Sequence, residues 1–366
     1  MVSRSNKICI IGSGLTAKLS AIITSRYGAS VTLYRDSSRV GQSQRLYALN
    51  YFSQCFLSHS KVEVDYAEQF SSIETWVDGS DLSITFLSTT LGVPQLGGLV
   101  SHGVLDMALD VAISKSNIQI IDIEQKQDSV ELLNSCMKEY SMVLVANAKS
   151  CPLFSYYQIP YHQKITTAQV SLLKHKQQRL YQSFDSNQSV GLLPFSENQA
   201  SLIYSSNKDS SQDLLASCEK LFNKRISLQS VTQVETIPEV TFRIAKKTVH
   251  DNVIVLGDSC DTIHPLAGQG LNQAISSIFY LDYVVAKSNN TLDLATFQNY
   301  QYLFFARVRP RSLAVHGFAK ILGLPTSALK SLFVLGEKMP LLEQNSLTNA
   351  LGMREVKLLK SFERVK

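Results

Sequence analysis

The chain has 366 residues, a length that suggests about two to three domain-sized units. Hydrophobic residues make up 45% of it, enough for large cores, and 35 basic against 30 acidic residues give a formal net charge of +5. No run of five basic residues occurs, which argues against a nucleic-acid-binding protein. The mild positive charge is compatible with a protein that lies near anionic lipid. The alternative is that the charge has no functional role.

The six cysteines form no Cys-x-x-Cys pair and no Cys/His cluster with zinc spacing. This usage fits a reducing cytosol, and we expect no metal site. The first residues lead straight into a strand without a signal-peptide pattern, and no apolar run approaches the roughly 18–20 residues that span a bilayer. We therefore expect a cytoplasmic protein, either free or peripheral at the inner face of the membrane.

The chain opens with a strand–turn–helix–strand pattern. Lys7–Ile11 is a short apolar strand, and Ser30–Tyr34 reads as a second strand after a helical stretch. The turn between them has the form Gly-x-Gly-x-x-Ala, which places a dinucleotide pyrophosphate on a helix N-terminus. We expect Gly12 to make the tight turn, Gly14 to let phosphate approach the backbone, and Ala17 to replace the third glycine.

An acidic residue normally ends the second strand of such a unit and binds a ribose hydroxyl. Here Arg35 holds that position and Asp36 follows it. Two interpretations stay open for Asp36: it reaches the ribose, or it is a solvated turn residue.

Farther along, the sequence alternates in the middle of the chain, and Lys164–Leu173 and Ala200–Ser205 are predicted strands of a mixed sheet. The apolar run Val253–Leu256 then reads as a buried strand that ends in Gly257-Asp258. This places a carboxylate at the carboxyl edge of a sheet, where α/β folds bind ligands.

The loop from His264 to Asn272, His-Pro-Leu-Ala-Gly-Gln-Gly-Leu-Asn, follows that strand. Pro265 and two glycines shape a turn, and the helix predicted from Leu271 to Val285 can aim backbone N–H groups at an electron-rich ring. The alternative is an ordinary Gly/Pro loop between a strand and a helix.

Both motifs, with four further blocks, resemble the FAD-dependent hydroxylases of ubiquinone biosynthesis, which belong to the para-hydroxybenzoate hydroxylase-like aromatic flavin monooxygenases. The resemblance extends from Lys7 to about Met353, and Gly257–Asn272 is its most specific part. The further blocks are Arg45–Ser53, Leu91–Val100 with Leu105, Gly191–Phe195 and Leu342–Met353.

The resemblance implies an α/β fold: a Rossmann-like FAD-binding domain of the para-hydroxybenzoate hydroxylase-like (GR2) type, interleaved with a mixed β-sheet substrate domain and followed by C-terminal helices. Those helices either cap the FAD domain or form a surface for membrane or partner subunits. The expected bounds are 1–70, 98–150 and 243–300 for the FAD-binding domain, 71–97 and 151–242 for the substrate domain, and 301–366 for the C-terminal helical region.

The resemblance also implies a monooxygenase that hydroxylates the aromatic ring of a polyprenylated phenol, a ubiquinone precursor. FAD would be the cofactor, NADPH or NADH a transient electron donor, O2 the co-substrate and a flavin C4a-hydroperoxide the oxidant. Subunits of a ubiquinone-synthesis complex are implied partners. The implied cofactor-binding residues are Gly12, Gly14, Ala17, Asp36, Arg45, Gly257, Asp258, Pro265, Gly268, Gln269, Gly270, Leu271 and Asn272.

Because the flavin performs the chemistry, no side chain is assigned as catalytic with certainty. His264 is either a substrate contact or a residue that satisfies a backbone carbonyl. Arg45 either lies near the phosphate–ribityl side of the flavin or makes a surface salt bridge.

Three departures from the family pattern weaken cofactor contacts: Arg35, Asn147-Ala148 in place of Asp-Gly, and Ser259-Cys260-Asp261 in place of Ala-Ala-His. They favour an alternative, a catalytically weak or inactive FAD-binding paralogue that acts as a subunit of a ubiquinone-synthesis assembly. A flavin halogenase is disfavoured, because such enzymes keep a Trp-x-Trp-x-x-Ile element and Trp76 has none around it.

Overall fold

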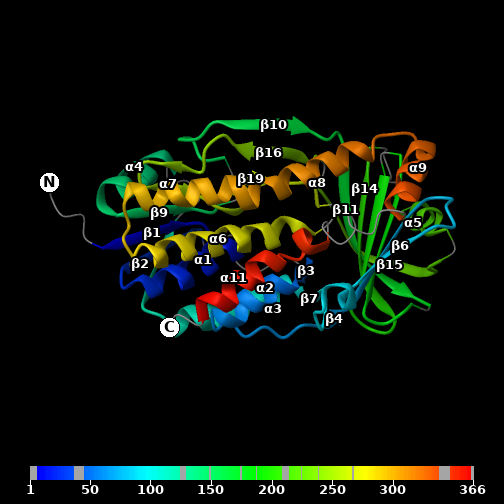
Figure 1. Cartoon of the computed structure of the whole chain (residues 1–366), viewed down its shortest axis with the longest axis horizontal. Helices are drawn as coiled ribbons and strands as arrows, with labels where there is room; N and C mark the ends of the chain where they lie inside the picture. Colours follow the sequence, from blue (N-terminus) through cyan, green and yellow to red (C-terminus); the bar gives the residue numbers. More distant parts are fainter. Residues whose placement is uncertain are drawn as a thin grey trace.

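A parallel sheet and a larger, mostly antiparallel sheet occupy opposite ends of the molecule, and long helices run between them (Figure 1). Both termini lie toward the parallel-sheet end. This is a computed structural model, and it describes residues 6–36, 45–123, 129–147, 150–173, 175–186, 188–207, 214–223, 225–237, 239–265, 268–337 and 347–363.

The parallel sheet contains the first predicted strands. Its order is β17-β18-β9-β1-β2-β8, with only the edge strand β17 antiparallel. Strands β9 and β18 are wholly buried, as expected where helices cover both faces of a parallel sheet. The strands are β1 (Lys7–Ile11), β2 (Ser30–Asp36), β8 (Ile118–Ile123), β9 (Met142–Val145), β17 (Val249–His250) and β18 (Val253–Val255).

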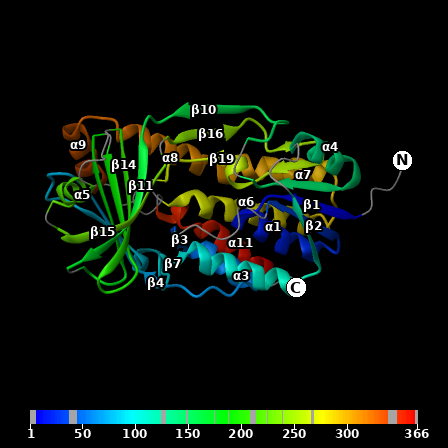
Figure 2. The ribbon, with the colours of Figure 1, turned by 180° about the vertical axis from the view of Figure 1, so that it is seen from behind.

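Helices from distant parts of the sequence surround this sheet (Figure 2). The predicted first helix is α1, which ends at Thr24 and continues as a 3₁₀ turn, η1 (Ser25–Tyr27), before Gly28 adopts φ +72° at its C-cap. The principal helices here are α1 (Leu15–Thr24), α2 (Tyr51–His59), α3 (His102–Ser114), α4 (Ser129–Glu139), α6 (Gln269–Lys287) and α7 (Leu294–Leu303).

Two three-stranded antiparallel sheets connect the ends of the molecule, with orders β3-β7-β4 and β10-β16-β19. Two 3₁₀ turns, η3 (Ser88–Leu91) and η4 (Gly257–Ser259), lie in connecting segments. The strands are β3 (Leu46–Asn50), β4 (Glu68–Phe70), β7 (Gly97–Ser101), β10 (Tyr156–Pro160), β16 (Thr241–Ala245) and β19 (Asp261–Thr262).

The large sheet has the order β15-β11-β14-β13-β12-β5-β6, and only β5 and β12 pair in parallel. One face packs on α5 (Leu214–Phe222) around the fully buried Trp76, whose indole N–H donates to the Leu221 carbonyl at 3.1 Å. The other face is left for a cavity. The strands are β5 (Ser72–Val77), β6 (Ile84–Leu87), β11 (Lys164–Leu172), β12 (Arg179–Asp185), β13 (Gln188–Pro194), β14 (Gln199–Ser206) and β15 (Leu228–Ile237).

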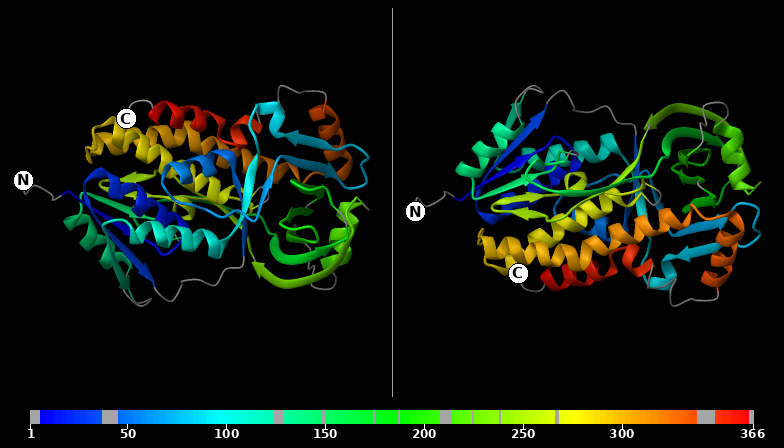
Figure 3. Two further views of the ribbon diagram at one scale, coloured as in Figure 1. Left: turned by 90° about the horizontal axis from the view of Figure 1, so that it is seen from below. Right: turned by 90° about the horizontal axis from the view of Figure 1, so that it is seen from above.

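The C-terminal helices contact both ends of the molecule. They therefore do more than cap the FAD domain, which was one of the two expectations from the sequence. A π-helical segment, η6 (Phe304–Val308), leads into α8 (Arg309–Ile321), and α9 (Thr326–Glu337) packs Leu329 against Val77 and Phe184 of the large sheet. Figure 3 shows α9 beside the β5–β6 hairpin. Of the block Leu342–Met353, residues 342–346 lie outside the described residues, and α11 (Met353–Glu363) follows it.

Candidate functional site

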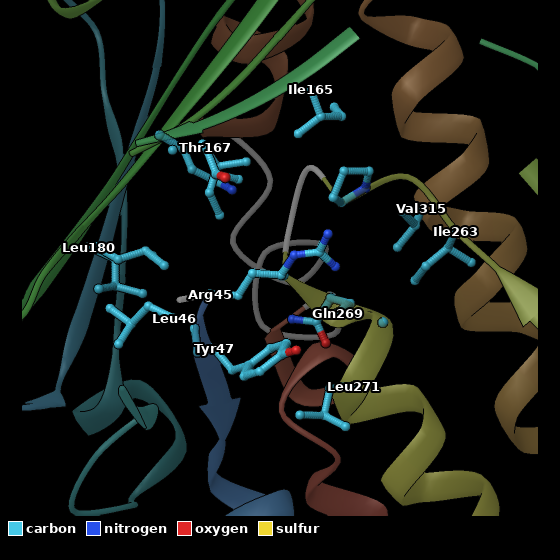
Figure 4. Close-up of a pocket in the computed structure, with 18 of the residues that line it drawn as sticks. Arg45, Leu46, Tyr47, Ile165, Thr167, Leu180, Ile263, Gln269, Leu271 and Val315 are labelled. Carbon is cyan, nitrogen blue, oxygen red and sulfur yellow. The ribbon is translucent and has the colours of Figure 1, made fainter. Parts of the chain in front are cut away.

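A cavity of about 1520 Å³ lies between the two ends of the molecule. The turn after β1, strand β3 and the start of α6 line one part of it, and the open face of the large sheet and α8 line the rest. Figure 4 shows Arg45, Tyr47, Gln269 and Leu271 gathered on one side, with Ile165 and Thr167 of β11 across from them.

The Gly-x-Gly turn shows why its two glycines differ. Gly12 has φ +153°, and a Cβ there would lie 2.3 Å from the carbonyl oxygen of Ala146 and 3.0 Å from the Cβ of Ala17. Gly14 has φ −88°, caps α1, lines the cavity and has no atom within 4 Å of a Cβ built on it. Gly12 and Ala17 therefore serve close packing, whereas Gly14 leaves open space at a helix N-terminus, where an anion is favoured.

The end of β2 lies beside the same turn. The backbone N–H of Asp36 donates to Ser13 Oγ at 2.7 Å, and Asp36 is not among the residues lining the cavity. Arg35 Nε lies 2.6 Å from Asp122 Oδ1 on the neighbouring strand β8, directly opposite in register. The arginine at the expected acidic position is thus paired across the sheet.

The second glycine-rich loop touches the first. Gly257 has φ +55°, and a Cβ there would lie 3.0 Å from the Thr16 side chain. Asp258 lines the cavity next to it, and its carbonyl accepts hydrogen bonds from Arg243 Nη2 at 2.5 Å and Thr262 Oγ1 at 3.2 Å. The carboxyl group is accessible from the cavity but surrounded by protein, and this burial raises its pKa above the usual value, opposed by Arg243 and Arg45.

The start of α6 faces the cavity with little side chain in the way. Gly268 adopts φ +59° at the N-cap, and neither Gly268 nor Gly270 has an atom within 4 Å of a built Cβ. Pro265, Gln269 and Leu271 line the cavity beside them, and residues 266–267 of the loop lie outside the described residues. Together with Gly14 and Asp258, these open helix N-termini fit a dinucleotide such as FAD, which carries both an anionic pyrophosphate and a flat polar ring.

Asn272 has a different place from the one expected beside a flavin ring. Its side chain is buried and does not line the cavity. Its Oδ1 accepts from the Asn50 backbone N–H at 2.9 Å and from Ser53 Oγ at 2.8 Å, and its Nδ2 donates to the Ala48 carbonyl at 2.9 Å. Asn272 therefore fixes β3 and α2 against α6, behind the cavity wall.

Arg45 lines the cavity and also makes a salt bridge, so both interpretations of this residue find support. Its Nη2 lies 3.6 Å from Glu235 Oε1 on β15, and both side chains remain largely accessible. Arg45 thus joins the cofactor side of the cavity to the large sheet.

Tyr47 and His102 also line the cavity, and neither was predicted from the sequence as a site residue. The Tyr47 hydroxyl and His102 Nδ1 lie 3.1 Å apart, and burial raises the pKa of Tyr47 and lowers that of His102. Tyr47 lies inside the Arg45–Ser53 block, and His102 begins the helix after Leu91–Val100, so proximity to these blocks was the available signal.

His264 is completely buried and is not among the residues that line the cavity. Its Nε2 lies 2.7 Å from Gln163 Oε1, and its ring packs edge-on against Tyr161 with centroids 4.7 Å apart. Burial lowers the pKa of His264 to about 4, which keeps the ring neutral at physiological pH. This position favours the structural alternative, with the amide side chain of Gln163 as a partner.

The residues that depart from the family pattern, Asn147, Ser259 and Asp261, make hydrogen bonds in the structure. Asn147 N–H donates to Ser259 Oγ at 2.9 Å, and the Ser259 hydroxyl lies 3.0 Å from Asn147 Oδ1, whereas Ala148 lies outside the described residues. Asp261 Oδ2 accepts from Arg309 Nε at 3.0 Å and from Ser312 Oγ at 2.6 Å. The replaced positions are therefore built into the hydrogen bonding around Asp258.

The remaining part of the cavity is apolar. Side chains from the open face of the large sheet meet side chains from α8 and α9, and among the described residues no group of His, Cys, Asp and Glu is arranged to hold a metal ion. The apolar lining includes Ile73, Phe86, Leu180, Phe184, Leu193, Ile203, Val315, Phe318, Leu332 and Phe333.

Comparison with known proteins agrees with this geometry. A family model described as an FAD binding domain matches residues 161–292. The 3-demethoxyubiquinol 3-hydroxylase of Escherichia coli (strain K12) is 25% identical over 305 residues, which cover 74% of this chain and 77% of that protein.

Solved structures share the fold. Klebsiella pneumoniae HpxO, complexed with FAD and uric acid, is 14% identical with a TM-score of 0.71, covering 94% of this chain and 96% of that one. The flavin-dependent brominase Bmp2 is 11% identical with a TM-score of 0.68, covering 98% of this chain and 99% of that one. At this level of identity the likeness to the brominase concerns the fold alone. With a match to an FAD binding domain and a hydroxylase relative at 25% identity, the chain is similar to the para-hydroxybenzoate hydroxylase-like FAD-dependent aromatic monooxygenases.

Proposed function

We propose that the protein hydroxylates the ring of a phenol that carries a long apolar tail, a polyprenylphenol-type precursor of ubiquinone. The observation that carries this proposal is the continuity of the cavity. It extends from the open helix N-termini at Gly14 and Gly268 to an apolar space between the large sheet and α8–α9. A polar cofactor end joined to an apolar space suits an aromatic ring with a hydrocarbon tail.

In this proposal the first part of the cavity holds FAD. The α1 N-terminus at Gly14 binds the pyrophosphate, Asp258 accepts a hydrogen bond from a ribityl hydroxyl, and Arg45 lies on the phosphate–ribityl side. Backbone N–H groups of residues 268–271 face the ring, and Asp36 is proposed for the adenosine ribose. FAD, when bound, supplies oxygen activation with electrons from NADPH or NADH.

The chain's own residues position the substrate and exclude water. The apolar side chains Leu180 and Leu193 from the large sheet and Val315 from α8 offer no hydrogen-bond partners to water, so a bound tail would leave this part of the site dry. In this proposal, the packing of the aromatic ring against these side chains determines which ring carbon is hydroxylated.

We also propose the domain division predicted from the sequence. The protein is proposed to be cytoplasmic, either free or peripheral at the inner face of the membrane. Subunits of a ubiquinone-synthesis assembly are proposed partners. The alternative is a weakly active or inactive FAD-binding subunit. It is supported by Asn147, which stands where the family pattern has the Asp of an Asp-Gly pair and whose side chain accepts a hydrogen bond from Ser259.

Deletion of the gene, followed by mass analysis of the accumulated quinone precursors, tests the pathway. We expect loss of the quinone and accumulation of a precursor that lacks one hydroxyl group. An unchanged quinone profile would contradict the proposal. If the precursor accumulates and a variant that binds FAD but lacks turnover restores the quinone, the alternative of a non-catalytic subunit is supported instead.

A further inference from the structure

Three glycines lie in the strands that the structure describes, and two of them have a structural reason to be glycine. In β7, a Cβ on Gly97 would collide with the Leu49 carbonyl. A Cβ on the next residue, Gly98, would collide with the Gln54 side chain. The third is Gly191 in β13, the central strand of the large sheet. Glycine weakens a strand relative to alanine, so a glycine in the middle of a sheet needs a cause.

The backbone around Gly191 supplies no such cause. Gly191 does not adopt a left-handed φ, and its pairing with β12 and β14 continues without a bulge. A Cβ built on it would have the Ile203 carbonyl oxygen, at 4.0 Å, as its nearest contact beyond the adjoining residues. An alanine would therefore fit here without strain. A strand glycine with neither a bulge nor a close backbone neighbour indicates a position that a ligand approaches closely.

Gly191 faces the cavity and not the core of the large sheet. Gly191 and Leu193 line the cavity. Val190 and Leu192, which alternate with them along β13, are buried in the core around Trp76. Although β13 is the central strand, Gly191 is partly exposed, and because the other face of the strand is covered, this exposure is toward the cavity. The absent side chain therefore leaves a recess in the cavity wall.

Side chains of the neighbouring strands surround the recess at Gly191. Gln182 on β12 and Ile203 on β14 lie directly opposite Gly191 in register, and Thr167 on β11 follows Ile203 in the same row. All of these residues line the cavity, and Figure 4 shows Thr167 on the opposite side of the cavity from Gln269. A ring that lies at the recess would thus contact an apolar side chain and have hydroxyl and amide groups in the same row.

We propose that Gly191 determines which rings the cavity accepts, because the flat face of the substrate's aromatic ring lies against its bare backbone. The inference rests on the proposed function and adds the contact that selects the ring. A rigid ring cannot bend around a side chain at this position, whereas a flexible tail can. Thr167 and Gln182 would hydrogen-bond an oxygen substituent, so the substrate class is a planar ring that carries a hydroxyl or ether oxygen.

The test measures binding of 2-prenylphenol and 2-geranylphenol to the full-length FAD-loaded protein, through the change in flavin absorbance and without turnover. Gly191→Ala should weaken binding of 2-prenylphenol by about tenfold, the effect of one carbon atom in a closely fitting pocket. Gly191→Val should weaken it further. The loss should be the same for 2-geranylphenol, because the added side chain meets the ring and not the longer tail.

Thermal unfolding of the same variants separates this role from a structural one. Gly191→Ala should raise the midpoint of unfolding, because alanine is favoured over glycine in a strand, and FAD affinity should stay at the wild-type value. A glycine that the fold requires would give a lower midpoint. The matched control is Gly103→Ala on α3, an exposed glycine that also has open space at its Cβ but does not line the cavity. It should bind both phenols as the wild type does.

Wild-type affinity for 2-prenylphenol in Gly191→Ala would overturn the inference, and so would a lower unfolding midpoint or a loss confined to 2-geranylphenol. The two proposals can also fail separately. A wild type that binds both phenols, loses them on Gly191→Ala and hydroxylates neither contradicts the proposed function alone. Hydroxylation of 2-prenylphenol with the same KM by the wild type and by Gly191→Ala contradicts the role of Gly191 alone. A wild type that binds neither phenol contradicts both.

Discussion

Asn147 and Ser259 are joined through one hydroxyl group: the Asn147 N–H donates to Ser259 Oγ at 2.9 Å, and that hydroxyl lies 3.0 Å from Asn147 Oδ1. Both residues stand where the chain departs from the family pattern that it resembles, one after β9 and the other in η4 beside Asp258. The two replacements therefore form a pair that holds two neighbouring strand ends together.

The first prediction concerns this pair. Ser259→Ala should lower the free energy of unfolding by about 1–3 kcal/mol, because Ser259 is buried and its loss removes the acceptor of the Asn147 N–H. Asn147→Ala should cost less, and the double variant should cost about as much as Ser259→Ala alone. Urea unfolding of the FAD-free variants measures this, with exposed Ser331→Ala as control. Strictly additive losses would show that the two side chains are not coupled.

The two glycines of the first turn should respond in opposite ways to the same change. Gly12→Ala should destabilise the fold, because its Cβ would lie 2.3 Å from the Ala146 carbonyl oxygen at φ +153°. Gly14→Ala should fold normally, because its Cβ meets no protein atom within 4 Å at an ordinary φ, but it should weaken FAD binding. Thermal unfolding and flavin fluorescence titration separate the two effects. Unchanged FAD affinity in Gly14→Ala would contradict the placement of the pyrophosphate.

Asp258→Ala should lose tight FAD binding, since hydrogen bonds to charged groups contribute about 1.5–3 kcal/mol. That energy corresponds to a loss in affinity of roughly 10- to 100-fold. The exposed Asp81→Ala, outside the cavity lining, serves as the matched control. Retention of FAD by the Asp258 variant at wild-type affinity would mean that the Gly257-Asp258 assignment is wrong.

His264 should make stability depend on pH. In the folded protein its pKa is lowered to about 4, whereas an unfolded histidine titrates near 6.5. The unfolded state therefore takes up a proton first, so the stabilising contribution is complete above pH 6.5 and is lost as pH falls toward 4. The full effect is up to about 3 kcal/mol.

The corresponding measurement is the unfolding free energy between pH 7 and 4 in the wild type and in His264→Gln. The wild type should lose more stability than the variant over this range, and the exposed His250→Gln should behave as the wild type. Parallel pH curves for the wild type and His264→Gln would rule out this contribution.

Local patterns predicted much of the fold. The strand Lys7–Ile11 is confirmed as β1, the alternating segment Lys164–Leu173 corresponds to β11, and Val253–Leu256 contains β18. These three strands could be predicted because burial on one or both faces of a sheet produces a hydrophobic pattern among residues that are close in sequence.

Partners that are distant in sequence could not be predicted in this way. Asn272 binds the backbone of Asn50, and Arg45 pairs with Glu235, across separations that no local pattern encodes. His264 has the loop position of a substrate contact, but Gln163 and Tyr161 enclose it. Side-chain roles at the site therefore depend on how β3, α6 and the large sheet meet.

The most direct test of the central claim is one turnover experiment in ¹⁸O2. The full-length protein is loaded with FAD and given NADPH and a phenol with a short prenyl chain, and the products are analysed by mass spectrometry. We predict a hydroxylated ring that carries ¹⁸O. Oxidation of NADPH that yields only labelled hydrogen peroxide, with no labelled ring product, would contradict the assignment of this cavity to aromatic hydroxylation.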